Sequence, residues 1–72
     1  MTKVFKLQDL ECANCAAKME HAIAKLDAVN TASVNFLTQK MVIDADETQF
    51  DEVMQKVVKI CRKIEPDCKI ML

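Results

Sequence analysis

The chain has 72 residues, of which 51% are hydrophobic, and ten basic against eleven acidic residues give a net charge of −1. This length fits one small domain spanning residues 1–72, and the balanced charge excludes the basic surface that nucleic-acid binding requires. No apolar run reaches the ~18 residues of a membrane span, and no secretory signal follows Met1, so we expect a cytoplasmic chain without direct membrane insertion. The four cysteines could form two disulfides in a secreted protein, but two of them lie three positions apart, which favours a reducing compartment.

Hydrophobic periodicity predicts four strands and two helices. The strands alternate apolar and polar residues, whereas the helices repeat apolar residues every three or four positions. In chain order the expected elements are a strand at 4–8, a helix at 13–26, strands at 31–37 and 41–45, a helix that begins at Thr48 and is stopped by Pro66, and a strand at 68–72. Because glycine is absent, the candidates for turn or left-handed positions are Asp27, Asn30, Asn35 and Asp46.

The order β-α-β-β-α-β fits the ferredoxin-like fold of the α+β class. In this fold one four-stranded antiparallel sheet carries both helices on one face. If the strand and helix directions alternate, the loop with the first two cysteines, the 37–40 turn and the 64–68 segment meet at one end. Residues far apart in sequence could therefore approach each other there.

The chain is organised around Cys12 and Cys15, which lie where the first strand gives way to the first helix. Thiols three positions apart in a first helical turn converge on one point, and the helix N-terminus favours the thiolate. A thiolate pair of this kind either holds a soft metal ion or exchanges electrons as a dithiol and disulfide. On the same helix, Met19 is interpreted as a packing residue and His21 as a solvated one, and Leu10 is expected to anchor the loop to the core.

These residues resemble the heavy-metal-associated domain found in soluble copper chaperones and at the N-termini of metal-transporting P-type ATPases. The resemblance covers essentially the whole chain and is carried by Phe5-Lys6-Leu7, Cys12-Ala13-Asn14-Cys15, Met19-Glu20, Ala32-Ser33-Val34-Asn35-Phe36 and Asp46. It implies the ferredoxin-like fold and a metal ion bound by the two cysteines of the motif. The family motif is usually Gly-Met-Thr-Cys-x-x-Cys, whereas here Asp9, Leu10 and Glu11 hold the first three places.

Ligand preferences favour a divalent ion over copper. Two thiolates in a near-linear site satisfy Cu(I), and a nearby carboxylate adds only repulsion and a hard ligand. Zn(II), and by similarity Cd(II) or Pb(II), takes three or four ligands and accepts oxygen. Family members associated with zinc, cadmium and lead export look similar, with an acid before the first cysteine or before the last strand. Glu11 holds the first place, Glu65 and Asp67 are candidates for the second, Cys68 is a further candidate ligand, and Cys61 is expected in the core.

The leading hypothesis is a binding module, not an enzyme on its own, that takes up Zn(II), Cd(II) or Pb(II) and hands it on by thiolate ligand exchange. The resemblance implies the N-terminal domain of a metal-exporting ATPase, whose partners are the membrane and other cytoplasmic domains of that chain, and a monomer when isolated. One alternative is a soluble Cu(I) chaperone of the same fold. Another is a glutaredoxin-like thiol oxidoreductase, although a hairpin follows the first helix where that fold needs another helix.

Overall fold

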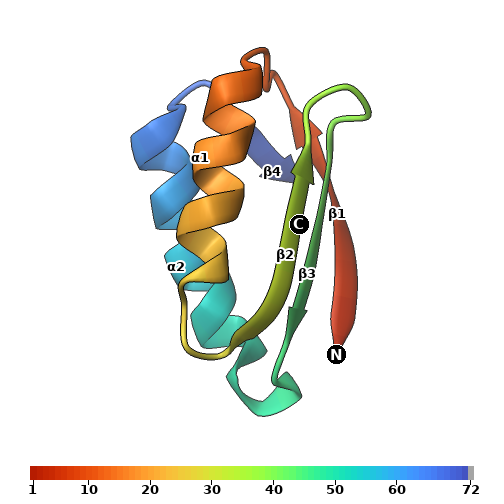
Figure 1. The fold of residues 1–72 in the computed structure, drawn as a ribbon, viewed down its shortest axis with the longest axis vertical. Coiled ribbons are helices and arrows are strands. Elements are labelled where there is room, and N and C mark those ends of the chain that lie inside the picture. Colours follow the sequence, from red (N-terminus) through yellow and green to blue (C-terminus); the bar gives the residue numbers. More distant parts are fainter. Residues whose placement is uncertain (72) are drawn as a thin grey trace.

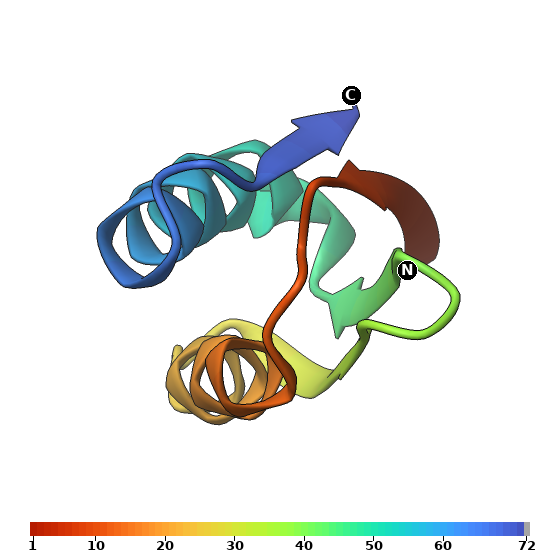
Figure 2. The same ribbon diagram turned by 90° about the horizontal axis from the view of Figure 1, so that it is seen from above.

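A computed structural model describes residues 1–71 and contains the predicted order of elements. They are β1 (Thr2–Gln8), α1 (Ala13–Ala24), β2 (Val29–Asn35), β3 (Lys40–Ala45), the short 3-10 helix η1 (Glu47–Gln49), α2 (Phe50–Ile64) and β4 (Lys69–Met71). The sheet has the strand order β2-β3-β1-β4, and each neighbouring pair is antiparallel. Both helices lie on the same face of this sheet (Figure 2). The ferredoxin-like fold is therefore confirmed.

The core lies between the helices and the face of the sheet that they cover. Alternate residues of β3 are fully buried, and so are residues at helical spacing on α1 and α2, as the two periodicities predict. The largest fully buried side chains are Leu10, Met19, Ile23, Met41, Ile43, Val57 and Cys61. Leu10 belongs to the loop before α1, so its burial ties that loop to the core as expected.

The beginning of α2 differs from the prediction. Thr48 was expected to cap the helix, but it lies inside η1, and α2 begins at Phe50. Asp46 caps η1, and its Oδ1 accepts hydrogen bonds from the Thr48 backbone amide at 3.0 Å and from the Thr48 hydroxyl at 2.9 Å, whereas Gln49 at the start of α2 caps that helix with no side-chain hydrogen bond. A carboxylate two residues earlier can accept both donors, so the chain begins to coil before the position that Thr48 would have capped.

Other element ends are also displaced from the predicted ones by one or two residues. The first helix ends at Ala24 rather than residue 26, and β2 begins at Val29 and stops at Asn35. The strand stops there because Asn35 Oδ1 accepts the backbone amides of Leu37 and Thr38 and so starts the turn. The last strand was predicted at 68–72 and comprises Lys69–Met71, while residue 72 lies outside the described residues.

Two residues without glycine's freedom adopt the left-handed backbone conformation. Asp9 has φ 64° and Gln39 has φ 54°, and within residues 1–71 no other residue has a positive φ. None of the predicted turn residues is therefore left-handed, although Asn35 and Asp46 do shape turns through their side chains. Asp9 stands where the motif of the resembling family usually has Gly, and a left-handed backbone is a conformation that glycine adopts without steric cost.

Three connections meet at one end of the molecule, as the strand directions predict. They are the 9–12 loop between β1 and α1, the 36–39 turn between β2 and β3, and the 65–68 segment between α2 and β4 (Figure 1, top). The end where the three connections meet holds the candidate metal ligands.

Within residues 1–71, no helix combines the length and the apolar character that crossing a membrane requires.

Candidate metal centre

Cys12 occupies the N-terminal cap of α1, where extended backbone (φ −126°, ψ 117°) turns into helix. Its Sγ accepts a hydrogen bond from the Cys15 backbone amide at 3.2 Å, and its carbonyl oxygen accepts the Ala16 amide at 3.0 Å. Sulfur here takes the place of the side-chain oxygen that usually caps a helix. The cap therefore fixes Cys12 at the helix start with Cys15 one turn later, and both side chains are half-buried.

The pKa values of the two thiols are shifted in opposite directions. The pKa of Cys12 lies below its ordinary value of 9.0, because the Cys15 thiol and then the Cys15 backbone amide donate hydrogen bonds to its sulfur. The pKa of Cys15 rises to about 11, first because its thiol donates a hydrogen bond to the Cys12 sulfur, and then because partial burial and the Glu65 carboxylate, which shares the same thiol proton, also favour the neutral form. Cys12 is thus the more acidic thiol of the pair, and metal binding has to displace the proton of Cys15.

Glu65 is the carboxylate that lies against the thiol pair. It caps the C-terminus of α2, and its Oε2 accepts a hydrogen bond from Cys15 Sγ at 3.7 Å across a separation of 50 residues. Its Oε1 accepts the Asp67 backbone amide at 3.4 Å, which orients the carboxylate. The predicted approach of the segment before β4 to the cysteine loop is therefore confirmed by a direct contact.

The other two candidate acids, Glu11 and Asp67, are exposed. Within residues 1–71, neither carboxylate forms a hydrogen bond with a thiol, and no group of three or more His, Cys, Asp or Glu residues is arranged as a ready metal cage. An open pocket of about 500 Å³ is lined by Asp9, Glu11, Glu65, Pro66, Asp67 and Lys69. This lining gathers four carboxylates at the same end as the cysteines. Because neither Glu11 nor Asp67 contacts a thiol, their roles as ligands stay predictions.

Cys61 and Cys68 form a second pair of cysteines, at the C-terminal end of α2 and before β4. They are only 2% and 8% exposed, and both line a separate pocket of about 460 Å³. Burial, with a smaller contribution from neighbouring Cys68, raises the pKa of Cys61 to about 12, and burial also raises the pKa of Cys68. All four cysteines are free thiols, so the structure contains no disulfide framework. Cys61 lies in the core as expected, and the role of Cys68 as a ligand stays a prediction.

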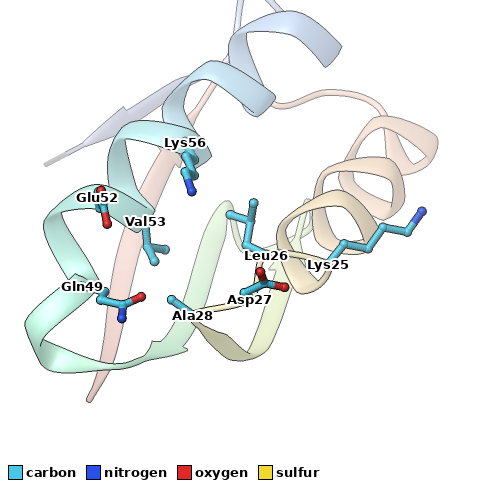
Figure 3. Close-up of a pocket in the computed structure, with 8 residues that line it drawn as sticks. All are labelled: Lys25, Leu26, Asp27, Ala28, Gln49, Glu52, Val53 and Lys56. Carbon is cyan, nitrogen blue, oxygen red and sulfur yellow. The ribbon is translucent and has the colours of Figure 1, made fainter.

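A further pocket, of about 320 Å³, lies at the opposite end of the molecule. Figure 3 shows side chains from the segment that follows α1, from η1 and from the first turns of α2 around this pocket. Its lining residues are Lys25, Leu26, Asp27, Ala28, Gln49, Glu52, Val53 and Lys56. None of them is a cysteine or a histidine, so the pocket offers no soft-metal ligand.

His21 is exposed on α1, as its interpretation as a solvated residue requires.

Gln39 contacts the cysteine loop, although the sequence predicted it only as part of a turn. Its side-chain Oε1 accepts the Leu10 backbone amide at 3.0 Å, and its Nε2 donates to the carbonyl oxygens of Leu10 and Phe36. No pattern in the sequence marks this contact, because a glutamine in a polar turn is typical of a solvated side chain. Only the meeting of the turn and the loop in space reveals it.

Comparison with known proteins identifies the family of the chain. The model of the heavy-metal-associated domain matches residues 4–69. The zinc/cadmium/lead-transporting P-type ATPase of Escherichia coli (strain K12) is 40% identical over 55 residues, which are 72% of this chain but 8% of the ATPase. The copper chaperone CopZ of Enterococcus hirae is 27% identical over 64 residues, which are 89% of this chain and 86% of the chaperone.

The fold also matches that of solved structures. A CopZ metallochaperone superposes with a TM-score of 0.73 over 99% of this chain and 100% of the chaperone, at 15% sequence identity. Identity this low supports the fold alone, whereas the family rests on the match over residues 4–69. The chain therefore belongs to the heavy-metal-associated domain family, and it is a metal-binding module related to metal-transporting P-type ATPases and to copper chaperones.

Proposed function

We propose that this chain takes up a soft divalent ion, Zn(II), Cd(II) or Pb(II), through Cys12 and Cys15 and passes it on by thiolate ligand exchange. The half-buried pair is open enough for an incoming ligand to reach the ion, which exchange requires. The lowered pKa of Cys12 makes this sulfur the easier one to deprotonate, and metal binding also displaces the proton of Cys15. The module binds and transfers its cargo and has no catalytic step of its own.

One observation carries the choice of a divalent ion, namely the contact between Cys15 Sγ and Glu65 Oε2 at 3.7 Å. A zinc site takes three or four ligands at about 2.0–2.3 Å, so a carboxylate already beside the sulfur needs only a small movement to become the third ligand. Glu65 is better placed for this role than Glu11 or Asp67, because it alone of the three contacts a thiol in the described residues.

The charge at this end of the molecule supports the same choice. Four carboxylates line the pocket that includes Glu65, against one lysine. Two thiolates and one Cu(I) ion have a net charge of −1, which these carboxylates repel, whereas a divalent ion leaves the thiolate pair neutral. The related ATPase of Escherichia coli, named for zinc, cadmium and lead, agrees with a divalent cargo for this chain.

We propose a cytoplasmic module of a metal-exporting P-type ATPase as the context. The chain spans 8% of the length of the related ATPase, so the pump itself would lie in other domains, which are the partners that exchange metal with Cys12 and Cys15. The isolated module is proposed to be a monomer. A soluble Cu(I) chaperone is the second candidate, because the chain spans 86% of the copper chaperone CopZ. The glutaredoxin-like alternative has no support, since the β2–β3 hairpin follows α1 directly.

The test compares Glu65→Gln with Glu11→Gln. Both variants remove one negative charge from the same pocket, and glutamine keeps the oxygen that accepts the Asp67 amide. Dissociation constants for Zn(II) and for Cu(I) are measured by competition with chelators at one pH and salt concentration. Glu65→Gln should weaken Zn(II) binding about ten- to a hundredfold, which corresponds to ~1.5–3 kcal/mol for losing a charged partner. Cu(I) binding should be equal to that of the wild type or tighter, because one repelling charge is removed.

Glu11→Gln is the matched control and should change both affinities by less than about threefold, since its charge is exposed and screened. A loss of Zn(II) affinity in Glu11→Gln but not in Glu65→Gln would assign the third ligand to Glu11. Unchanged Zn(II) affinity in both variants, with Cu(I) bound more tightly than Zn(II), would favour the copper chaperone.

A further inference from the structure

Two contacts hold the loop before Cys12, and both of them end at Leu10. The Leu10 side chain is 1% exposed, and its backbone N–H and C=O both bond to the side-chain amide of Gln39. Within residues 1–71, no other hydrogen bond reaches the backbone of the 9–11 segment. The path from β1 to the first metal-binding cysteine is therefore fixed at one residue, by the core on one side and by Gln39 on the other.

Gln39 is itself held firmly. Its carbonyl oxygen accepts the Leu7 amide at 2.7 Å, which continues the pairing of β1 with β3, and its Nε2 also donates to the Phe36 carbonyl oxygen within the same turn. The backbone at Gln39 is left-handed, with φ 54°. These bonds hold the Gln39 side-chain amide in place. The amide contacts the loop at Leu10, two residues before Cys12.

We infer that Gln39 is a positioning residue of the metal site, which fixes Leu10 so that Cys12 and Cys15 converge on one ion. This inference rests on the proposed function. Gln39 touches neither sulfur, so it acts through the loop, as partners beyond the direct ligands commonly do when they orient a metal site. A looser loop leaves the sulfurs free to spread, and part of the binding energy is then spent on ordering them.

The chemistry of the contact explains why the residue is a glutamine. One backbone N–H and one C=O need an acceptor and a donor on the same planar group, which a primary amide supplies. A carboxylate would lack the donor, an ammonium would lack the acceptor, and the amide of asparagine lies one methylene nearer the backbone. Asparagine and glycine, however, tolerate the left-handed backbone at least as well as glutamine. The turn and the contact can therefore be separated by substitution.

The test uses Gln39→Gly and Gln39→Asn, with Thr38→Ala as the control in the same turn. Glycine and asparagine suit the left-handed turn but remove or shorten the amide, whereas Thr38 contacts its neighbours only through its backbone in the recorded hydrogen bonds. We expect both Gln39 variants to bind Zn(II) about tenfold more weakly, the lower range for a lost orienting partner. Hydrogen exchange of the Leu10 amide should also become faster, and Thr38→Ala should match the wild type in both measurements.

Urea unfolding of the metal-free variants separates positioning from stability, because it gives the fraction of folded molecules for each. Wild-type Zn(II) affinity in Gln39→Gly would overturn the inference. So would an affinity that falls only in proportion to the folded fraction, since the amide would then be structural alone. Cys15→Ser is included as a separate arm: if Cys15→Ser binds Zn(II) as the wild type does, the proposed function fails, whatever the Gln39 variants do.

Discussion

The two cysteine pairs of this chain have the same chemistry but opposite surroundings. Cys12 and Cys15 are half-buried at a helix N-terminus, where backbone amides and a neighbouring thiol stabilise one thiolate. Cys61 and Cys68 are buried against the sheet, where the pKa of each thiol is raised by loss of water. Position in the fold, rather than the presence of cysteine, therefore decides which thiols are accessible and more acidic.

The largest expected effect is on metal binding. Cys12→Ser or Cys15→Ser should weaken Zn(II) binding by at least about a hundredfold, because each removes one of two soft ligands, and this corresponds to ~2.7 kcal/mol or more. Cys61→Ala and Cys68→Ala should bind Zn(II) within about threefold of the wild type, once corrected for any unfolded fraction. Chelator competition measures all four constants. A hundredfold loss in Cys68→Ala would return Cys68 to the site and remove the distinction between the pairs.

The next effect is on thiol reactivity in the metal-free protein. The thiolate is the nucleophile, so alkylation at neutral pH should modify Cys12 first and Cys15 more slowly, because the pKa of Cys15 is raised to about 11. Cys61 and Cys68 should react at least about tenfold more slowly than Cys12, because burial adds a steric barrier to a raised pKa. Mass spectrometry of peptides after limited alkylation gives the order. Equal rates for Cys12 and Cys68 would contradict it.

How far sequence predicts this molecule depends on whether the signal is periodic. The order of elements, the burial of alternate residues in β3 and the position of Cys12 and Cys15 followed from repeats of two and of three to four residues. The end of a strand or helix depends on single side chains: Asp46 caps the short helix η1, so the chain coils before Thr48, the predicted cap of α2. The hydrophobic periodicity of a sequence does not show which of two neighbouring polar residues will form the capping hydrogen bonds.

The place of Cys12 and Cys15 at the start of the first helix was predictable from the sequence, whereas the contacts around these sulfurs were less so. Three acids satisfied the sequence criteria for a third ligand, and the contact that favours Glu65 depends on where α2 ends, 50 residues from Cys15. The amide of Gln39 depends in turn on a left-handed residue in a turn that contains no glycine. Both contacts join segments that only the completed sheet brings together, which is why neither leaves a local pattern.

A smaller effect is expected from alkaline pH on the buried pair. The pKa of Cys61 is raised from 9.0 to about 12 in the folded protein, so its contribution to stability is complete below pH 9 and is lost as the pH rises from about 9 through 12. In that window the unfolding free energy should fall by on the order of 1 kcal/mol per pH unit relative to Cys61→Ala, which lacks this thiol. Urea unfolding of both proteins at several pH values measures the difference. Parallel pH profiles would show that Cys61 does not ionise on unfolding.

The smallest expected effect concerns the backbone of the loop that leads to Cys12. Asp9 has φ 64°, a conformation that costs an ordinary residue about 1–2 kcal/mol, while glycine in place of another residue loses about 0.5–1 kcal/mol more entropy on folding. Asp9→Gly should therefore raise the unfolding free energy of the metal-free protein by about 0.5–1 kcal/mol. The measurement is the urea midpoint at an unchanged slope, since a changed slope would indicate a different unfolded state.

Asp9→Asn is the control for charge, because it removes the carboxylate from the acidic pocket but keeps a side chain that tolerates the left-handed backbone. If asparagine stabilises the protein as much as glycine does, the gain comes from relieved repulsion among the four carboxylates of that pocket. If only glycine stabilises it, the strain lies in the backbone of the loop that leads to Cys12. The buried cysteine pair has no left-handed residue beside it within residues 1–71, so the second result would place the strain on the side of the molecule that is proposed to exchange metal.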